Sequence, residues 1–415
     1  MDLILGAGIT GLSYAMFKGD QDYVVVEKES EVGGYCRTTK RNGFVWDFSG
    51  HFFHFQKQDI KDLIMSRMNQ EELVSVIKLT RIKYKDLLVD YPFQKNIHQL
   101  SKAELLDCLF DLFSNTQLDY DNFQEMLYCK FGKSIAEKFL IPYNEKLYAC
   151  DLNSLDKNAM GRFFPYADKE DIIRNFKSSD NASYNGTFVY PKGGAIEYVN
   201  SVLSYVDPTK ICCNEEVKEI RLDDHIVILS DGRSLQYDRL ISTLPFPTLL
   251  RMAQVNFDAD IYNWNQVLCF NLGFSAKGQD TENHWLYFPE KKYCFYRIGF
   301  YDNIIGQDRM SLYIELGFSK DKTIHPNEWL GPVLEDLKKA GIVSDHQVLV
   351  DYQSIVMDPA YVHINKDSLK DVVQKKEMLA SYDVYSIGRY GSWTYCSIED
   401  NITEAKELAN TLNRK

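Results

Sequence analysis

Three glycines near the start of the chain, Gly6, Gly8 and Gly11, have the spacing of a phosphate-binding turn. They follow the apolar run Asp2–Leu5 and precede the helical run Leu12–Lys18. In this context the first glycine permits a tight turn, the second lets the backbone approach a pyrophosphate, and the third lets helix and strand pack closely. The segment therefore predicts a dinucleotide-binding βαβ unit. A glycine turn in an unliganded α/β fold is the alternative.

An acidic residue, Glu27, follows the next apolar run, where a carboxylate would accept the hydroxyls of an adenosine ribose. It opens the segment Glu27–Thr38 (EKESEVGGYCRT). This segment resembles the E-K-x-x-x-x-G-G-x-x-x-T stretch of the amine-oxidase and protoporphyrinogen-oxidase group of FAD proteins. In that group the paired glycines, and usually an arginine, contact the FAD diphosphate. The resemblance implies FAD as the cofactor.

Two later segments fit the same group. Asn214–Ile220 resembles the strand whose valine lies against the adenine, and Gly388–Arg389, followed by a helix near Ser397, resembles the segment that closes on the isoalloxazine. The resemblance assigns the following residues to the cofactor: Gly6, Gly8, Gly11, Glu27, Lys28, Gly33, Gly34, Arg37, Ser49, Gly50, Val217, Gly388 and Arg389.

The elements that carry these residues are far apart in the chain, so we expect an α/β fold with a discontinuous Rossmann-like FAD-binding domain from residues 1–60, 185–245 and 380–415. Residues 98–180 have helical periodicity and predict a helical insert on the substrate side. Residues 246–379 carry short β-like runs and, with 80–97, predict an antiparallel-sheet substrate domain.

Several segments narrow the resemblance to UDP-galactopyranose mutases, and to their eukaryotic-type branch. Gly43–His51 (GFVWDFSGH) resembles their G-F-x-x-D-x-G-G-H loop, whose histidine lies over the flavin, and Tyr91–Ile97 (YPFQKNI) resembles the Y-P-F-Q-N-N-I segment that faces the uridine. The other matching segments are Gly132–Ala149, Trp285–Arg297 and Gly388–Tyr395. The match runs in order over nearly the whole chain.

The resemblance implies that Arg297 and Arg389 grip the substrate diphosphate, for which guanidinium groups are suited. It places His51 over the flavin, although a structural histidine is the alternative, and these three residues are the expected catalytic set. Ser49 departs from the family's first glycine, and its Cβ is expected to stiffen the loop. The expected substrate-binding residues are Phe93, Gln94, Arg162, Asn185, Trp285, Tyr287, Arg297, Tyr361 and Tyr395, with a packed core tyrosine as the alternative at Tyr361.

The resemblance implies interconversion of UDP-galactopyranose and UDP-galactofuranose, an isomerisation that serves cell-surface polysaccharide synthesis. In such mutases the reduced flavin N5 attacks the anomeric carbon, UDP leaves, the sugar recloses as a furanose, and UDP returns. NAD(P)H or a separate flavin reductase is the expected reductant, and a homo-oligomer is compatible with the resemblance. The alternative is an FAD-dependent oxidoreductase of the amine-oxidase or protoporphyrinogen-oxidase type.

Composition excludes other classes of function. The formal net charge of −12 argues against a nucleic-acid partner and against a basic membrane-docking face. No uncharged apolar run approaches the roughly 20 residues that span a bilayer, and no signal peptide precedes the first strand, so we expect a cytoplasmic protein. The 9 cysteines lack metal-like spacing, which predicts free thiols and no metal site.

Overall fold

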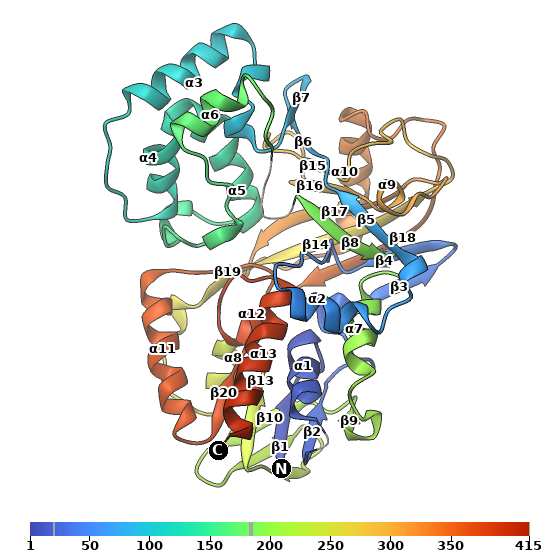
Figure 1. Ribbon diagram of the computed structural model, residues 1–415, viewed down its shortest axis with the longest axis vertical. Helices are drawn as coiled ribbons and strands as arrows, with labels where there is room; N and C mark the ends of the chain where they lie inside the picture. Colours follow the sequence, from blue (N-terminus) through green and yellow to red (C-terminus); the bar gives the residue numbers. More distant parts are fainter. Residues whose placement is uncertain (20, 182–185, 415) are drawn as a thin grey trace.

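The computed structural model of the chain describes residues 1–19, 21–181 and 186–414. It has three regions (Figure 1): a parallel sheet with its helices at the bottom, a large and mostly antiparallel sheet at the upper right, and a group of helices at the upper left. The predicted α/β class, with a Rossmann-like part, a helical insert and a second sheet, is confirmed.

The parallel sheet has the strand order β20-β13-β1-β2-β9, and every neighbouring pair is parallel. All four residues of β1 are buried, which suits a continuous apolar run at the centre of a sheet that is covered on both faces. The strands are β1 (Asp2–Leu5), β2 (Tyr23–Val26), β9 (Ile211–Cys212), β13 (Arg239–Ser242) and β20 (Val384–Ser386). They come from all three segments assigned to the FAD-binding domain, whose boundaries stay a prediction.

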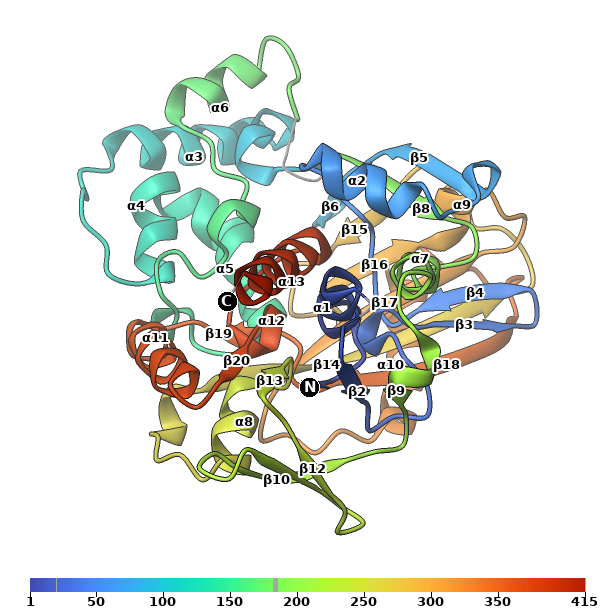
Figure 2. The same ribbon diagram turned by 60° about the horizontal axis from the view of Figure 1, so that its bottom comes forward.

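Helices α1 (Ile9–Lys18), α7 (Ile196–Leu203) and α13 (Ile398–Asn413) pack side by side over this sheet (Figure 2). The hydroxyl of Ser397 caps α13 by accepting a hydrogen bond from the Asp400 N–H, which fixes where the helix starts. A small antiparallel sheet made of β10 (Val217–Arg221), β11 (Ile226–Leu229) and β12 (Ser234–Gln236) lies away from α1.

The large sheet has the order β18-β14-β17-β16-β15-β6-β7, and β19 (Val362–His363) also pairs with β14. Its strands are β6 (Thr80–Tyr84), β7 (Leu87–Asp90), β14 (Asn263–Phe274), β15 (Trp285–Tyr287), β16 (Arg297–Phe300), β17 (Ser311–Ser319) and β18 (Leu349–Met357). Every pair is antiparallel except β15 with β6. The exception arises because β6 and β7 form a hairpin from far upstream, which joins the sheet edge without a tight turn to β15.

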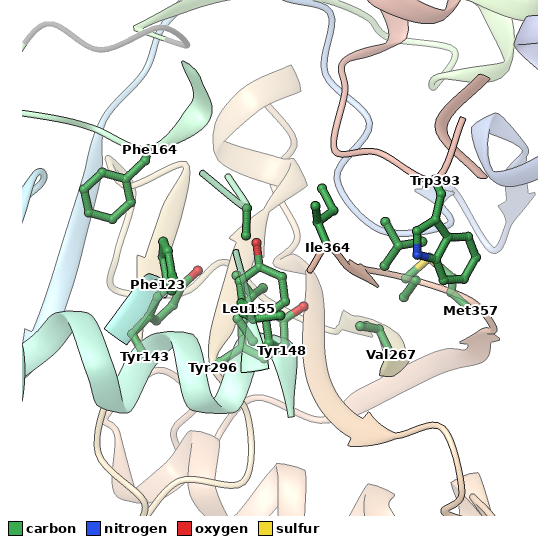
Figure 3. Packing of buried hydrophobic residues seen from close by; sticks show 14 of the residues in the cluster. Phe123, Tyr143, Tyr148, Leu155, Phe164, Val267, Tyr296, Met357, Ile364 and Trp393 are labelled. Carbon is green, nitrogen blue, oxygen red and sulfur yellow. The ribbon is translucent and has the colours of Figure 1, made fainter. Parts of the chain in front are cut away.

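The helical insert consists of α3 (Lys102–Ser114), α4 (Phe123–Ile135), α5 (Ile141–Tyr148) and α6 (Lys169–Asn175). Side chains cap three of these helices: Ser101, Asn122 and Asp168 each accept a hydrogen bond from a backbone N–H in the first turn. Aromatic residues of the insert pack toward the large sheet, among them Tyr143 and Tyr148 beside Tyr296 (Figure 3). The helical insert therefore packs against the large sheet through these aromatic residues.

The remaining elements join these regions. The hairpin β3 (Thr38–Arg41) and β4 (Phe44–Asp47) lies beside β14, and β5 (Leu73–Ile77) pairs with β8 (Thr187–Pro191). The other helices are α2 (Gln58–Met65), α8 (Phe246–Met252), α9 (Tyr301–Ile305), α10 (Pro326–Lys339), α11 (Lys366–Ala380) and α12 (Gly388–Gly391). Among the described residues, none of the helices combines the length and apolar character needed to cross a membrane.

Candidate active site

A cavity of about 1080 Å³ runs from the glycine turn after β1 to the large sheet. It brings together residues that lie at both ends and in the middle of the chain. The predicted site residues that line it are Gly6, Gly8, Glu27, Lys28, Gly33, Gly34, Arg37, Ser49, Gly50, His51, Val217, Trp285, Tyr287, Arg297, Tyr361, Gly388, Arg389 and Tyr395.

The glycine turn has no room for a side chain at Gly6 or Gly11. A Cβ on Gly6, whose φ is +100°, would lie 2.3 Å from the Thr243 hydroxyl, and a Cβ on Gly11 would lie 2.0 Å from the Gly6 carbonyl oxygen. Gly11 therefore lets α1 pack against the turn and does not itself line the cavity. A Cβ on Gly34 would lie 3.4 Å from the Gly8 Cα, so the two glycine segments meet backbone to backbone. Such an exposed backbone rim suits a diphosphate.

Glu27 lies at the rim and is 8% exposed. Its Oε2 accepts a hydrogen bond from the Ala7 N–H at 2.8 Å and its Oε1 accepts one from the Glu29 N–H at 2.9 Å. Each carboxylate oxygen can accept a further hydrogen bond, so a ribose hydroxyl remains possible as a ligand. Nearby, the Arg37 Nε donates to the Gly34 carbonyl oxygen at 2.9 Å, which holds this arginine beside the paired glycines.

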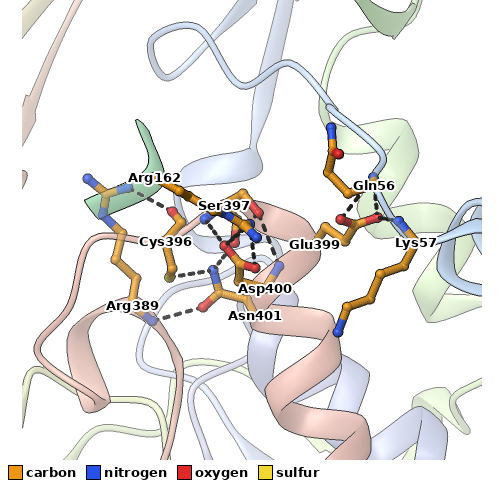
Figure 4. A network of polar contacts seen from close by, with 9 residues as sticks. All are labelled: Gln56, Lys57, Arg162, Arg389, Cys396, Ser397, Glu399, Asp400 and Asn401. Atoms are coloured by element: carbon orange, nitrogen blue, oxygen red, sulfur yellow. Dashed lines mark hydrogen bonds and ion pairs between the residues drawn. The ribbon is translucent and has the colours of Figure 1, made fainter. Parts of the chain in front are cut away.

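The C-terminal segment closes the cavity over α1. A Cβ on Gly388, whose φ is +87°, would lie 2.8 Å from the Thr10 hydroxyl. The Asn401 Oδ1 accepts hydrogen bonds from the Thr10 hydroxyl at 2.9 Å and from the Arg389 N–H at 2.8 Å. Figure 4 shows Asn401 and Arg389 joined in this network at the start of α13. The same contacts thus fix the glycine turn and the backbone of Arg389.

The Arg389 guanidinium lies between aromatic rings. Its central carbon is 4.7 Å from the ring centre of Tyr395 and 5.2 Å from that of Tyr361. One of its amino groups, Nη1, donates to the Cys396 carbonyl oxygen at 3.2 Å, whereas its buried Nε has no hydrogen-bond partner among the described residues. No carboxylate in the described part of the chain lies within ion-pair distance of Arg389. A half-buried cation without a carboxylate partner among the described residues favours an anionic ligand.

The second arginine, Arg297, already has an anionic partner. Its Nε and Nη2 lie 2.8 and 2.6 Å from Oε2 of Glu315, a carboxylate that is only 1% exposed. The Nη2 also donates to the Tyr361 hydroxyl at 3.3 Å. The other oxygen of Glu315 accepts a hydrogen bond from the Ser49 hydroxyl. Arg297 is therefore held in a fixed orientation at the wall of the cavity.

His51 lies on the loop that follows β4, close enough to both arginines for their charges to act on it. Burial lowers the pKa of its imidazole to about 4, and the positive charges of Arg389 and Arg297 act in the same direction. The ring is therefore neutral near pH 7, and its buried Nδ1 has no partner among the described residues. The loop is tightly held: a Cβ on Gly50 would lie 2.4 Å from the Tyr313 hydroxyl. A neutral ring with an unused nitrogen suits contact with a polar ligand.

A second cavity of about 110 Å³ opens beside the first, between the helical insert and the large sheet. The two cavities share Phe163, Tyr287, Arg297, Tyr361 and Tyr395, so they are continuous at Arg297. Tyr143 and Phe164 form part of its wall and are visible among the packed aromatic residues in Figure 3. Its size and aromatic lining suit one planar ring.

Three predicted substrate residues, Phe93, Gln94 and Arg162, do not line either cavity. Phe93 is buried and stacks on Phe139 at 5.2 Å, and Gln94 donates to the Pro165 carbonyl oxygen. Because Phe139 and Pro165 do line the second cavity, both residues support its wall from behind. Arg162 forms two 2.7 Å contacts to the carboxylate of Asp400. Asn185 lies outside the described residues. The substrate roles of these four stay predictions.

Sequence reasoning missed several charged residues of the cavity, among them Glu315 and Lys78. Burial, with a smaller contribution from Arg297, lowers the pKa of the Lys78 amine to about 7. The sequence could have identified Glu315, because an acidic residue within the apolar strand Ser311–Ser319 is expected to be buried and paired. Lys78 has no comparable pattern around it. The described residues contain no cluster of His, Cys, Asp or Glu that could hold a metal ion.

The chain is similar to several proteins of known structure. Reduced UDP-galactopyranose mutase has 25% sequence identity and a TM-score of 0.91, over 99% of this chain and 93% of that one. A putative protoporphyrinogen oxidase from Exiguobacterium sp. 255-15 has 16% identity and a TM-score of 0.78, over 99% and 98% of the two chains. For cyclohexylamine oxidase from Brevibacterium oxydans IH-35A the values are 13% and 0.70, over 99% and 98%. The last two show a shared fold alone.

The predicted resemblance to UDP-galactopyranose mutases within a larger group of FAD proteins is thus confirmed. The sequence profile described as flavin containing amine oxidoreductase matches residues 16–340, which is most of the chain. The chain is a flavoenzyme that belongs to the family of flavin containing amine oxidoreductases.

Proposed function

We propose that this protein is a flavin-dependent mutase that interconverts the pyranose and furanose forms of a UDP-hexose. The proposed substrate is UDP-galactose. The observation that carries the proposal is the half-buried Arg389 guanidinium, which lines a dinucleotide-sized cavity and has no carboxylate partner among the described residues. The 25% identity to reduced UDP-galactopyranose mutase supports the same assignment.

The proposed cofactor is FAD. The backbone rim at Gly8 and Gly34 would hold its diphosphate, Glu27 its adenosine ribose, and Val217 would face its adenine. When it is bound and reduced, FAD supplies the nucleophile that displaces UDP from the anomeric carbon. NAD(P)H or a separate reductase would supply the electrons. They are not consumed in turnover, because the sugar is isomerised without net redox change.

The residues of this chain would provide orientation and electrostatics. Arg389 and Arg297 would hold the diphosphate while the bond to the sugar is broken and would keep it close for its return. The ring-sized cavity beside Arg297 would receive the uracil between aromatic side chains such as Tyr143 and Phe164. The neutral imidazole of His51 would face the reacting groups without adding a third charge. Enclosure by tyrosines would exclude water, which would otherwise hydrolyse the sugar.

The alternative is an oxidoreductase that acts on an amine, and the family match together with the tyrosine-lined cavity speaks for it. An aromatic cage can bind an ammonium group through cation–π contacts. In this cavity, however, Tyr361 and Tyr395 already enclose the guanidinium of Arg389, whose charge would repel an ammonium. The electrostatics therefore favour an anionic substrate.

The decisive experiment incubates the dithionite-reduced protein with UDP-galactopyranose and separates the products by chromatography. We expect UDP-galactofuranose to form with the reduced protein and not with the oxidised protein. UDP-glucose and UDP-N-acetylgalactosamine are tested in parallel, because the hexose-facing contacts are the least constrained. Absence of any furanose product, together with bleaching of the oxidised flavin by an amine, would reverse the assignment. A furanose product would also be consistent with a role in cell-surface polysaccharide synthesis.

A further inference from the structure

Ser49 has a backbone conformation that residues with a side chain rarely adopt. Its φ is +71°, in the left-handed region that favours glycine. The residue is buried in the loop that follows β4 and leads to His51. A Cβ in this conformation costs free energy, so a serine here is expected to be retained for what its hydroxyl contacts.

The hydroxyl contacts the paired carboxylate of the site. Ser49 Oγ donates to Oε1 of Glu315, while Oε2 of the same carboxylate accepts from Nε of Arg297 at 2.8 Å and lies 2.6 Å from Nη2. The two oxygens of Glu315 thus have different hydrogen-bond partners. One is occupied by the loop and the other by the arginine, so the buried carboxylate links Ser49 directly to Arg297.

The loop backbone does not depend on this hydroxyl for its position. The Tyr301 hydroxyl donates to the Ser49 carbonyl oxygen at 3.4 Å, and Gly50 packs so closely on Tyr313 that a Cβ would lie 2.4 Å from its hydroxyl. Removing the Ser49 side chain should therefore leave the loop in place. What changes is the hydrogen bonding of Glu315.

We propose that Ser49 is a positioning residue that acts through Glu315 on Arg297. By occupying Oε1, its hydroxyl confines the carboxylate to the Nε and Nη2 edge of the guanidinium and leaves the Nη1 edge to the substrate anion. Without the hydroxyl, Oε1 competes with the anion for the remaining guanidinium N–H groups. The inference rests on the proposed function to the extent that this anion is the diphosphate of UDP.

The test compares Ser49→Ala and Ser49→Gly in the FAD-loaded protein, with UDP binding measured by titration calorimetry. Both variants lack the hydroxyl, so we expect both to bind UDP about tenfold more weakly. We expect KM for the UDP-sugar to rise with kcat nearly unchanged and the FAD content to stay the same. The two variants differ in strain, so Ser49→Gly should have the higher melting temperature.

Ser311→Ala is the matched control. Ser311 is also buried and lies on the same strand as Glu315, but its hydroxyl accepts a hydrogen bond from the Trp46 Nε1. This variant should lower the melting temperature without changing UDP affinity. In a Glu315→Gln background, Ser49→Ala should no longer weaken UDP binding, because the competing carboxylate is absent.

Wild-type affinity in both Ser49 variants would overturn the proposal, as would an undiminished effect of Ser49→Ala in the Glu315→Gln background. If the wild-type protein itself binds no UDP, the proposed function fails separately. Urea unfolding then decides the role of Ser49, since it needs no ligand. The effects of Ser49→Ala and Arg297→Ala on the unfolding midpoint should be non-additive, and additive effects would contradict the link.

Discussion

The strand that carries Arg297 and the short helix that carries Arg389 place the same functional group in contrasting surroundings. Arg297, at the start of β16, is neutralised by Glu315 and fixed in orientation. Arg389, in α12, has aromatic neighbours and, among the described residues, a single backbone acceptor and no partner for its Nε. One arginine is thus compensated before a ligand arrives and the other is not. If the proposed function holds, we expect Arg389 to supply most of the affinity for the substrate anion and Arg297 to orient it.

The largest effect is expected from Arg389→Lys. A lysine keeps the charge but loses the planar fork and the stacking between tyrosines, so we expect turnover of the UDP-sugar to fall by roughly 100-fold. Arg297→Lys should cost about tenfold, because its charge is already shared with Glu315. Steady-state kinetics of the reduced enzyme measures both. A larger loss of turnover in Arg297→Lys than in Arg389→Lys would contradict the expectation that Arg389 contributes more to binding the anion.

Glu315→Gln should leave Arg297, like Arg389, without a carboxylate partner among the described residues. Removing the carboxylate charge leaves Arg297 as a second uncompensated cation, so UDP affinity should rise by about tenfold in titration calorimetry. The same change should lower the free energy of unfolding, because a half-buried guanidinium loses its buried anionic partner, and the cost is on the order of 3 kcal/mol. Weaker UDP binding would mean that Glu315 orients Arg297 more than it neutralises it.

Much of this arrangement could be predicted from the sequence. The glycine turn, Glu27 and both arginines belong to short motifs whose spacing is set by backbone geometry, and all but Gly11 of the predicted cofactor residues line the cavity. Glu315 and Lys78 could not be placed in the site in this way, because their roles depend on which strands meet in the large sheet. The ion pair between Glu315 and Arg297, for instance, joins residues directly opposite each other on β17 and β16.

A further effect concerns the pH dependence of stability at His51, whose pKa is influenced by both arginines. Its pKa is lowered to about 4 from an ordinary 6.5, mainly by burial, so between these values the unfolded chain binds the proton and the folded protein does not. Stability should therefore rise with pH across this window, by up to about 3 kcal/mol from this residue. Urea unfolding at pH 5 and pH 7 should show a smaller difference in His51→Gln than in wild type.

Three other histidines contribute with the same sign. Burial also lowers the pKa of His54 and His363 to about 4 and lowers the pKa of His284, so His51→Gln should remove only part of the pH dependence. His346→Gln changes an exposed histidine and serves as the control.

NMR titration of the His51 ring tests the two arginines directly. Arg389 lowers its pKa more than Arg297 does, so Arg389→Ala should raise that pKa further than Arg297→Ala. Equal shifts would show that the two cations act on His51 to the same degree.

The smallest effect is expected at a third arginine, which the sequence alone places in the substrate site. Arg162 is bound by both oxygens of Asp400 at 2.7 Å, its side chain is 47% exposed, and it lines neither cavity. A charge that is already paired at the surface adds little to anion binding. Arg162→Lys should therefore change UDP affinity by less than about threefold. A tenfold loss would instead mean that Arg162 leaves Asp400 and turns toward the diphosphate when the substrate binds, as its sequence position suggests. In that case Arg162 would join Arg389 at the diphosphate, and the contrast between Arg297 and Arg389 would describe only the ligand-free protein.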